Sequence, residues 1–334
     1  MKPGKLPLDF LGQLLGKLTI EDKRVVLGPR PGEDAALIDF GDRYLVAKTD
    51  PITFATDFIG WYAVQVNAND IAVMGGKPRW MMATVLLPEA TTRKQVSNIF
   101  AQLDTAATQL GITLIGGHTE VSYDLPRPIV AGVMLGEVDK EKVVLTSGAK
   151  PGDILILTKG IAIEGTSILA REAAPMLRKK GVSSTTIRSA KEFLFDPGIS
   201  VVKDAAVVCA VADVHAMHDP TEGGLASALL EMAQAGCVGL ELDGDNVPVL
   251  PECEEFCHAL KLDPIGLIAS GALLAAVSPR DIEKLVDAMS REGIAVREIG
   301  RVIDVSHGVK IRTKGRLHRL PTFARDELVR HLGI

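Results

Sequence analysis

The chain has 334 residues, of which 47% are hydrophobic and 24% charged, so it is long enough for two globular domains with hydrophobic cores. A net charge of −5 and a pI near 5.9 argue against a nucleic-acid-binding protein, because such proteins usually carry a basic face. The Lys and Arg residues between positions 310 and 330 lack aromatic stacking partners, which favours a solvated surface there.

Charges interrupt the apolar residues at the start of the chain, and no stretch approaches the ~20 apolar residues of a membrane helix. We therefore expect a soluble cytoplasmic protein that has no membrane partner. The four cysteines all follow residue 208 and are too few for a disulfide framework. Buried or half-buried free thiols are the favoured interpretation, and a metal pair at Cys253 and Cys257, beside His258, is the alternative.

The first half of the chain predicts strands and helices in mixed order. Two apolar runs, 37–40 and 43–47, flank Gly41-Asp42 and predict a hairpin whose second strand ends at Lys48, Thr49 and Asp50. Helical spacing from Asp57 predicts a helix that Gly75-Gly76 and Pro78 end, so that Asn67 and Asp70 share one face. Further elements are expected at 80–87 (strand), 92–110 (helix), 112–115 (strand, running into Gly116-Gly117-His118) and 129–135 (strand).

The second half follows a loop-rich break at 147–153. Strands are expected at 154–157, 214–217, 238–242, 272–277 and 295–302, and helices from 164, at 199–212, after 224 and at 279–291. Because strands and helices do not alternate strictly, the pattern predicts an α+β fold. We expect an N-terminal extension (1–30), an N-terminal domain (31–147), a C-terminal domain (152–305) and a C-terminal tail (306–334).

Four short segments combine glycines with acidic or amide side chains. They are 32–36 (Gly-Glu-Asp-Ala-Ala), 48–50 (Lys-Thr-Asp), 67–76 (Asn-Ala-Asn-Asp-Ile-Ala-Val-Met-Gly-Gly) and 115–120 (Ile-Gly-Gly-His-Thr-Glu). Each lies where an apolar run meets a turn or a helix, so we expect their oxygens to converge at one edge of a sheet. Separated carboxylates suit Mg²⁺, which keeps substrate phosphates in its coordination shell. Each segment alone is more typical of a plain turn.

The known phosphate-binding glycine motifs of P-loop and dinucleotide-binding folds do not occur. The glycines at 32, 75–76 and 116–117 are alternative places for backbone N–H groups to approach phosphates. In the second half, Asp219 is expected between a strand and a helix that begins after Gly223-Gly224, where helix N-terminal N–H groups face an anion. The alternative is that Asp219 and Thr221 only cap that helix.

Together these segments resemble the aminoimidazole ribonucleotide synthetase (PurM-like) superfamily, which includes the hydrogenase maturation protein HypE, selenophosphate synthetase and thiamine-monophosphate kinase. The likeness covers about residues 30–305 and is greatest to HypE. It rests on Asn-x-x-Asp-Ile-Ala-x-Met-Gly-Gly-x-Pro at 67–78, the 32–36 and 116–120 segments, Asp-Pro-Thr-Glu-Gly-Gly-Leu at 219–225 and the strand entry at 271–275. The resemblance implies a two-domain α+β fold whose N-terminal domain forms a barrel across a homodimer, with ATP and Mg²⁺ in the cleft between the domains.

The resemblance also implies roles for particular residues. The metal and phosphate carboxylates would be Asp34, Asp50, Asp70 and Asp219, and Asp70, Asp219 and Lys48 would take part in catalysis. The remaining nucleotide-binding residues would be Gly32, Asp34, Thr49, Asn67, Gly116, Gly117, His118, Thr119, Glu164 and Thr166. HypE proteins usually carry Asp where His118 stands, so a histidine bonded to local backbone is the alternative there. An exposed lysine at a strand end is the alternative for Lys48.

The implied activity is ATP-dependent phosphorylation of an oxygen in a small-molecule or carbamoyl-type acceptor, with release of ADP. HypE carries its carbamoyl group on a C-terminal cysteine, whereas this sequence has no cysteine beyond Cys257. We therefore expect that the carbamoyl dehydratase reaction does not proceed by that route, unless the tail was trimmed from this sequence. No cysteine precedes Cys209, which argues against selenophosphate synthetase. The alternatives are a thiamine-monophosphate kinase-like enzyme, although residues 51–54 do not match its signature, and a nucleotide-binding maturation or regulatory partner without turnover.

Overall fold

The computed structural model describes residues 6, 8–53 and 57–332. Phe54, which belongs to the segment compared with the kinase signature, and residues 333–334, the end of the expected C-terminal tail, lie outside the described residues. Two compact units can be separated. The N-terminal unit comprises residues 20–29 and 34–143, and the C-terminal unit comprises residues 30–33, 144–332 and the described residues up to Thr19. The domain limits expected from the sequence stay a prediction.

The N-terminal unit is built on a six-stranded sheet in the order β1-β2-β3-β6-β4-β5. All neighbouring strands are antiparallel except β4 and β5, which are parallel. The predicted hairpin is present, because β2 and β3 pair in antiparallel fashion around the turn at Gly41-Asp42. The strands are β1 (Val25–Leu27), β2 (Ala36–Asp39), β3 (Arg43–Ile52), β4 (Lys77–Leu87), β5 (Thr113–Val121) and β6 (Ile129–Asp139).

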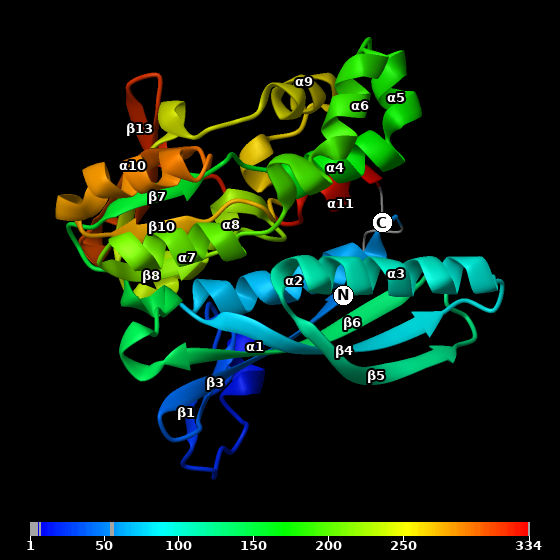
Figure 1. Cartoon of the computed structure of the whole chain (residues 1–334). Coiled ribbons are helices and arrows are strands. Elements are labelled where there is room, and N and C mark those ends of the chain that lie inside the picture. Colours follow the sequence, from blue (N-terminus) through cyan, green and yellow to red (C-terminus); the bar gives the residue numbers. More distant parts are fainter. Residues whose placement is uncertain (1–5, 7, 54–56, 333–334) are drawn as a thin grey trace. The chain divides into compact units, whose positions relative to one another are not determined.

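Two helices, α2 (Ile59–Val73) and α3 (Arg93–Leu110), pack side by side against this sheet (Figure 1). Helix α2 is buried on nearly its whole circumference, and within this unit it contacts β3, β4, β6 and α3. Helix α3 begins at a capping box formed by Thr92 and Gln95 and ends at Gly111 in the left-handed conformation. Both helices lie where the apolar spacing predicted them.

The C-terminal unit contains a seven-stranded sheet in the order β13-β12-β9-β11-β7-β10-β8. Its neighbouring strands are antiparallel except β9 and β12, which are parallel. The strands are β7 (Ile154–Thr158), β8 (Val214–His218), β9 (Gly239–Asp243), β10 (Leu274–Val277), β11 (Val296–Ile303), β12 (Val309–Thr313) and β13 (Arg316–Arg319). Mixed sheets with helices in both units confirm the expected α+β class.

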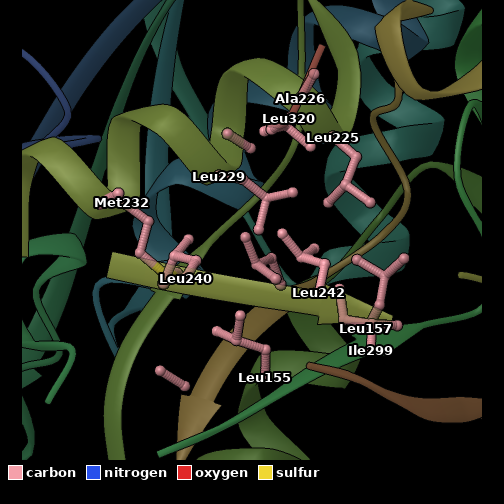
Figure 2. Packing of buried hydrophobic residues seen from close by; sticks show 14 of the residues in the cluster. Leu155, Leu157, Leu225, Ala226, Leu229, Met232, Leu240, Leu242, Ile299 and Leu320 are labelled. Carbon is pink, nitrogen blue, oxygen red and sulfur yellow. The ribbon is translucent and has the colours of Figure 1, made fainter. Parts of the chain in front are cut away.

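The core of the C-terminal unit forms where α8 packs on this sheet (Figure 2). Leu229 and Met232 of α8 face Leu240 and Leu242 of β9, and all four side chains are buried. The helices of this unit are α1 (Leu8–Leu15), α4 (Ile163–Glu172), α5 (Ala174–Lys179), α6 (Ser184–Glu192), α7 (Val202–Val211), α8 (Gly224–Gly236), α9 (Pro251–Leu260), α10 (Ile282–Arg291) and α11 (Glu327–Leu332). Across residues 8–53 and 57–332, none of the helices combines the length and apolar character needed to traverse a bilayer.

Two expectations need correction. The strand expected at 112–115 does not stop before the glycines, because β5 continues through Gly116-Gly117-His118 to Val121. The described part of residues 306–334 contains β12, β13 and α11. The thiol of Cys237 is exposed, whereas Cys253 and Cys257 are buried and Cys209 is half-buried.

Candidate functional site

A cluster of one ammonium and two carboxylates lies in the N-terminal unit, between β3 and α2. Nζ of Lys48 is 3.3 Å from Oδ2 of Asp70 and 3.9 Å from Oδ2 of Asp50. Lys48 and Asp50 alternate with Thr49 along β3 and therefore point to the sheet face that α2 covers. The alternative of an exposed strand-end lysine is wrong, because the Lys48 side chain is only 23% exposed and is ion-paired.

Asn67 joins this cluster from α2. Its Nδ2 donates to the carbonyl oxygens of Asp50 (3.2 Å) and Ala63 (2.8 Å), so the amide ties β3 to α2. Its Oδ1 is buried and has no hydrogen-bond partner within the described part of the chain. A buried amide oxygen without a partner is costly, so this atom requires an explanation beyond packing.

Gly132 of β6 makes room for that amide. It pairs with Asp50 across the sheet, and a Cβ at this position would lie 2.6 Å from Nδ2 of Asn67. Sequence reasoning missed Gly132, because a glycine within a predicted strand indicates a close approach without naming the group that approaches.

Thr49 points to the other face of the sheet. Its hydroxyl donates to the carbonyl oxygen of Gly132 at 2.8 Å, and the residue is exposed. It therefore supports the strand pairing beside the cluster without joining the two carboxylates.

The segment from Gly32 to Asp34 is where the chain passes from one unit to the other. Gly32 and Glu33 belong to the C-terminal unit, where the Glu33 carboxylate accepts the N–H groups of Thr146 (3.2 Å) and Ser147 (3.4 Å). Asp34 belongs to the N-terminal unit and is buried.

The glycine-rich segment of β5 does not reach this cluster within one chain. Strands β6 and β4 separate β5 from β3, a distance of about 14 Å across three strand spacings. His118 pairs with Thr84 and lies on the sheet face opposite to Lys48 and Asp50. The expectation that all four segments converge at one edge of the sheet is therefore wrong for a single chain.

Local structure explains two residues of this segment. A Cβ on Gly117 would lie 2.0 Å from the carbonyl oxygen of Ala83, so the approach of β4 demands glycine there. His118 is exposed and its Nε2 lies 3.2 Å from Oε2 of Glu120, a side-chain contact rather than the backbone bond considered from the sequence. Gly116 and Thr119 are exposed in the same strand.

Asp219 lies in the C-terminal unit, directly after β8 and before the turn that leads into α8, and is buried. Helix α8 has no side-chain cap, so the alternative that Asp219 or Thr221 caps it is wrong. The N–H groups of this turn are also less available to an anion than expected. That of Gly223 donates to Oδ2 of Asp326 at 2.6 Å, and that of Gly224 donates to the carbonyl oxygen of Thr221.

Asp326 is a residue that sequence reasoning missed. Its position before an apolar run predicts a local cap, and its Oδ1 does accept the N–H of Leu328 at 2.8 Å. The bond to Gly223, 103 residues away in sequence, has no local signal. Burial raises the pKa of Asp326 to about 6, against the opposing effect of its backbone hydrogen bonds, and Glu222 adds to the increase.

Glu164 and Thr166 are buried in the first turns of α4 in the C-terminal unit. Helix α9 packs against α4 and carries the buried thiols of Cys253 and Cys257, whose Sγ atoms are 4.0 Å apart. The hydrogen bond between the two thiols lowers the pKa of Cys253 and raises that of Cys257. No third ligand completes a metal site at this pair among the residues that the structure describes.

Family models match most of the chain. The N-terminal domain of AIR synthase related proteins matches residues 32–138, and the C-terminal domain of the same proteins matches residues 150–312. Carbamoyl dehydratase HypE of Cupriavidus necator is 30% identical, over 85% of this chain and 81% of that protein. The chain belongs to the AIR synthase-related family. A putative hydrogenase expression/formation protein of Methanocaldococcus jannaschii, 28% identical over 90% of this chain and 88% of its own, agrees with this assignment.

Solved structures show the fold of this AIR synthase-related chain. HypE in complex with ATP has a TM-score of 0.74 at 22% identity, covering 97% of this chain and 100% of its own. A HypE–HypF complex gives 0.72 at 23% identity, with coverage of 88% and 94%. Thiamine monophosphate kinase of Aquifex aeolicus gives 0.68 at 19% identity, with coverage of 93% and 97%. The two-domain PurM-like α+β fold is confirmed.

The resemblance to HypE and the expectation of an enzyme of this family are likewise confirmed. The roles expected for individual residues remain predictions.

Proposed function

We propose that the chain is an ATP- and Mg²⁺-dependent enzyme of HypE type that phosphorylates an oxygen of a small-molecule or carbamoyl-type acceptor. The acceptor oxygen forms a bond to the γ-phosphorus while the bond from that phosphorus to the leaving oxygen breaks, and ADP is released. Support comes from the related HypE protein, whose structure is known with ATP, and from the carbamoyl dehydratase of Cupriavidus necator.

The observation that carries the proposal is the Lys48 contact with Asp50 and Asp70. One ammonium and two carboxylates meet at a half-buried position, and carboxylate oxygens gathered in this way suit a divalent cation. A lysine has a flexible stem and a compact ammonium group, which suit Lys48 to bind a phosphate oxygen once a ligand is present. Enzymes catalyse phosphoryl transfer mainly by positioning the reactants and stabilising charge, and need little covalent catalysis.

The donor atoms fit Mg²⁺. Asp34, Asp50 and Asp70 of the N-terminal unit and Asp219 of the C-terminal unit are hard oxygen donors, and the buried Oδ1 of Asn67 is a further oxygen without a partner in the described chain. When bound, Mg²⁺ neutralises charge on phosphate oxygens. The proposed nucleotide-binding residues are otherwise Gly32, Thr49, Gly116, Gly117, His118, Thr119, Glu164 and Thr166.

A homodimer is part of the proposal. The face of the N-terminal sheet opposite α2 carries half-buried or exposed apolar side chains, among them Met82, Val133 and Leu135. Such a face favours burial against a second copy, in line with a barrel formed across the dimer. We propose that the β5 segment then forms one nucleotide-binding site with Asp50 and Asp70 of the partner subunit. Within one chain, β5 is three strands away from β3, which carries Asp50. We also propose a maturation partner, which the known HypE–HypF complex supports. The proposed site of action is the cytoplasm.

Two tests decide the proposal. The first test measures Mg-ATP affinity by isothermal titration calorimetry for the wild-type chain, for Asp70→Asn and for the control variant Asp104→Asn. The Asp104 residue is exposed on α3. We expect binding by the wild type and by Asp104→Asn and a loss of at least tenfold in affinity for Asp70→Asn. Absence of Mg-ATP binding by the wild type would contradict the proposal.

The second test measures ADP release with different acceptors. An S-carbamoylated peptide probes the HypE reaction, and thiamine monophosphate probes the alternative that the fold of the Aquifex aeolicus kinase suggests. Binding of Mg-ATP without ADP formation across both acceptors supports a non-catalytic nucleotide-binding partner instead.

A further inference from the structure

The C-terminal segment of residues 321–332 is fastened to the turn that follows Asp219. Within the C-terminal unit, Oδ2 of Asp326 accepts the N–H of Gly223 at 2.6 Å. Next to it, Oε2 of Glu327 accepts the N–H of Asp263 at 3.0 Å, and a Cβ on Gly266 would lie 2.7 Å from the Phe323 ring. Three neighbouring residues of one segment therefore hold two loops that are distant in sequence.

The turn itself has an unusual backbone. Gly223 and Gly224 have φ angles of 84° and 65°, a region that favours glycine. A Cβ on Gly224 would lie 2.6 Å from the carbonyl oxygen of Ile265, so this turn packs tightly on the loop that Glu327 also holds. A turn of this kind persists only where surrounding contacts define it.

The two ends of the stretch from Asp219 to Gly223 are fixed differently. Before it, β8 is held by its pairing with β10, in which His218 opposes Leu274. After it, α8 supplies no side-chain cap, and the N–H of Gly223 is satisfied by the Asp326 carboxylate. The backbone after Asp219 is therefore held by the Asp326 carboxylate together with the Thr221 carbonyl oxygen, which accepts the N–H groups of Gly224 and Ala269.

We infer that Asp326 is a positioning residue for Asp219: its carboxylate fixes the turn so that Asp219 presents its oxygens in one orientation. The inference rests on the proposed function, in which Asp219 binds metal and phosphate. A ligand group displaced by about 1 Å can cost 100-fold in activity, so a clamp on the adjacent turn has a measurable consequence. Asp326 acts through Asp219 and need not touch the ligand.

A purely structural role predicts something different. Oδ1 of Asp326 caps α11 through Leu328, and loss of that cap would affect stability alone. The chain offers a matched control in Asp281, which is also buried and whose Oδ2 accepts the N–H of Asp213 at 2.7 Å. Asp213 immediately precedes β8, so Asp281 anchors the opposite end of the strand that leads to Asp219.

The test compares Asp326→Ala and Asp326→Asn with Asp281→Ala in the full chain. Amide hydrogen exchange is followed over residues 219–224 without nucleotide, and Mg-ATP affinity is measured well below the unfolding transition of each variant. We expect exchange in this turn to rise at least tenfold in Asp326→Ala, less in Asp326→Asn, and not in Asp281→Ala. Mg-ATP affinity is expected to fall about tenfold or more in Asp326→Ala, by a smaller factor in Asp326→Asn, and not in Asp281→Ala.

A double-mutant cycle with Asp219→Asn separates positioning from general damage. If Asp326 acts through Asp219, Asp326→Ala has little further effect on Mg-ATP affinity once Asp219 is changed. Additive effects, or unchanged exchange in the turn of Asp326→Ala, overturn the inference. Absence of Mg-ATP binding by the wild type overturns the proposed function instead, and the exchange data then still decide whether Asp326 holds the turn. Should Asp326→Ala fail to fold, Asp326→Asn carries the same comparison.

Discussion

Nζ of Lys48 lies 3.3 Å from Oδ2 of Asp70 and thereby joins the middle of β3 to the last turn of α2. If Lys48 binds a phosphate oxygen, Lys48→Met removes a charge that acts on the transferring group. We expect kcat/KM for ATP to fall about 100-fold, the range found when one positioned donor is lost. Steady-state ADP release checks this, with Lys94→Met, an exposed position on α3, as the control. If Lys48→Met and Lys94→Met release ADP at the same rate, Lys48 does not contribute to the proposed site.

Gly132 gives the second prediction, because its missing Cβ leaves room for the Asn67 amide. Gly132→Ala places a methyl group 2.6 Å from Nδ2 of Asn67 and is expected to destabilise the fold by about 1–3 kcal/mol. Urea denaturation measures the change. Gly236→Ala is the control, since its nearest neighbours lie at an ordinary 3.4 Å, and we expect it to be neutral or slightly stabilising. An unaffected Gly132→Ala would show that the amide moves freely.

Lys159 provides a test of a buried ion pair away from the proposed site. Its Nζ lies 3.5 Å from Oδ1 of Asp204 and donates to the carbonyl oxygens of Ser200 and Gly198, and burial lowers its pKa. Lys159→Met leaves the buried Asp204 carboxylate without its cation and should cost about 3–5 kcal/mol of unfolding free energy. Lys142→Met, which removes an exposed pair with Asp139, should change nothing measurable in the same denaturation experiment.

Asp326 predicts a pH dependence of stability. Its pKa is about 6 in the fold, above the ordinary aspartate value of 3.8, so the folded state keeps its proton to higher pH than the unfolded chain. Stability from this group is therefore fully present below about pH 4 and is lost as pH rises through 6, with a total near 3 kcal/mol. The measurement is the difference in unfolding free energy between wild type and Asp326→Asn from pH 4 to 7. If the difference in unfolding free energy between wild type and Asp326→Asn is the same at every pH, Asp326 is not the group that titrates.

Subunit complementation tests the proposed dimer. We expect light scattering to give twice the chain mass. Neither Asp70→Asn nor a chain with both His118→Ala and Thr119→Ala should release ADP at the wild-type rate. If β5 serves the partner subunit, mixed dimers of these two variants contain one intact site and recover part of the activity. Mixed dimers that stay as inactive as the parents would place β5 outside the reaction.

Local signals in the sequence were sufficient for much of the fold. The polar turn at Gly41-Asp42 and the apolar spacing of α2 and α3 depend on residues close together in the chain, and the structure agrees with them. The ordered motifs at 67–78 and 219–225 were sufficient for the family, because they occur together. The placement of Asn67 and Asp70 on one face of α2 followed from helical spacing alone.

Only the tertiary structure decided which of these segments meet. The strand order β3-β6-β4-β5 separates Gly117 from Asp50, and the pairing of Asp50 with Gly132 creates the space for Asn67. The contact between Asp326 and Gly223 joins residues 103 positions apart. Short-range patterns encode backbone dihedral angles and which face is buried, whereas strand order and distant clamps depend on packing energy summed over the whole unit.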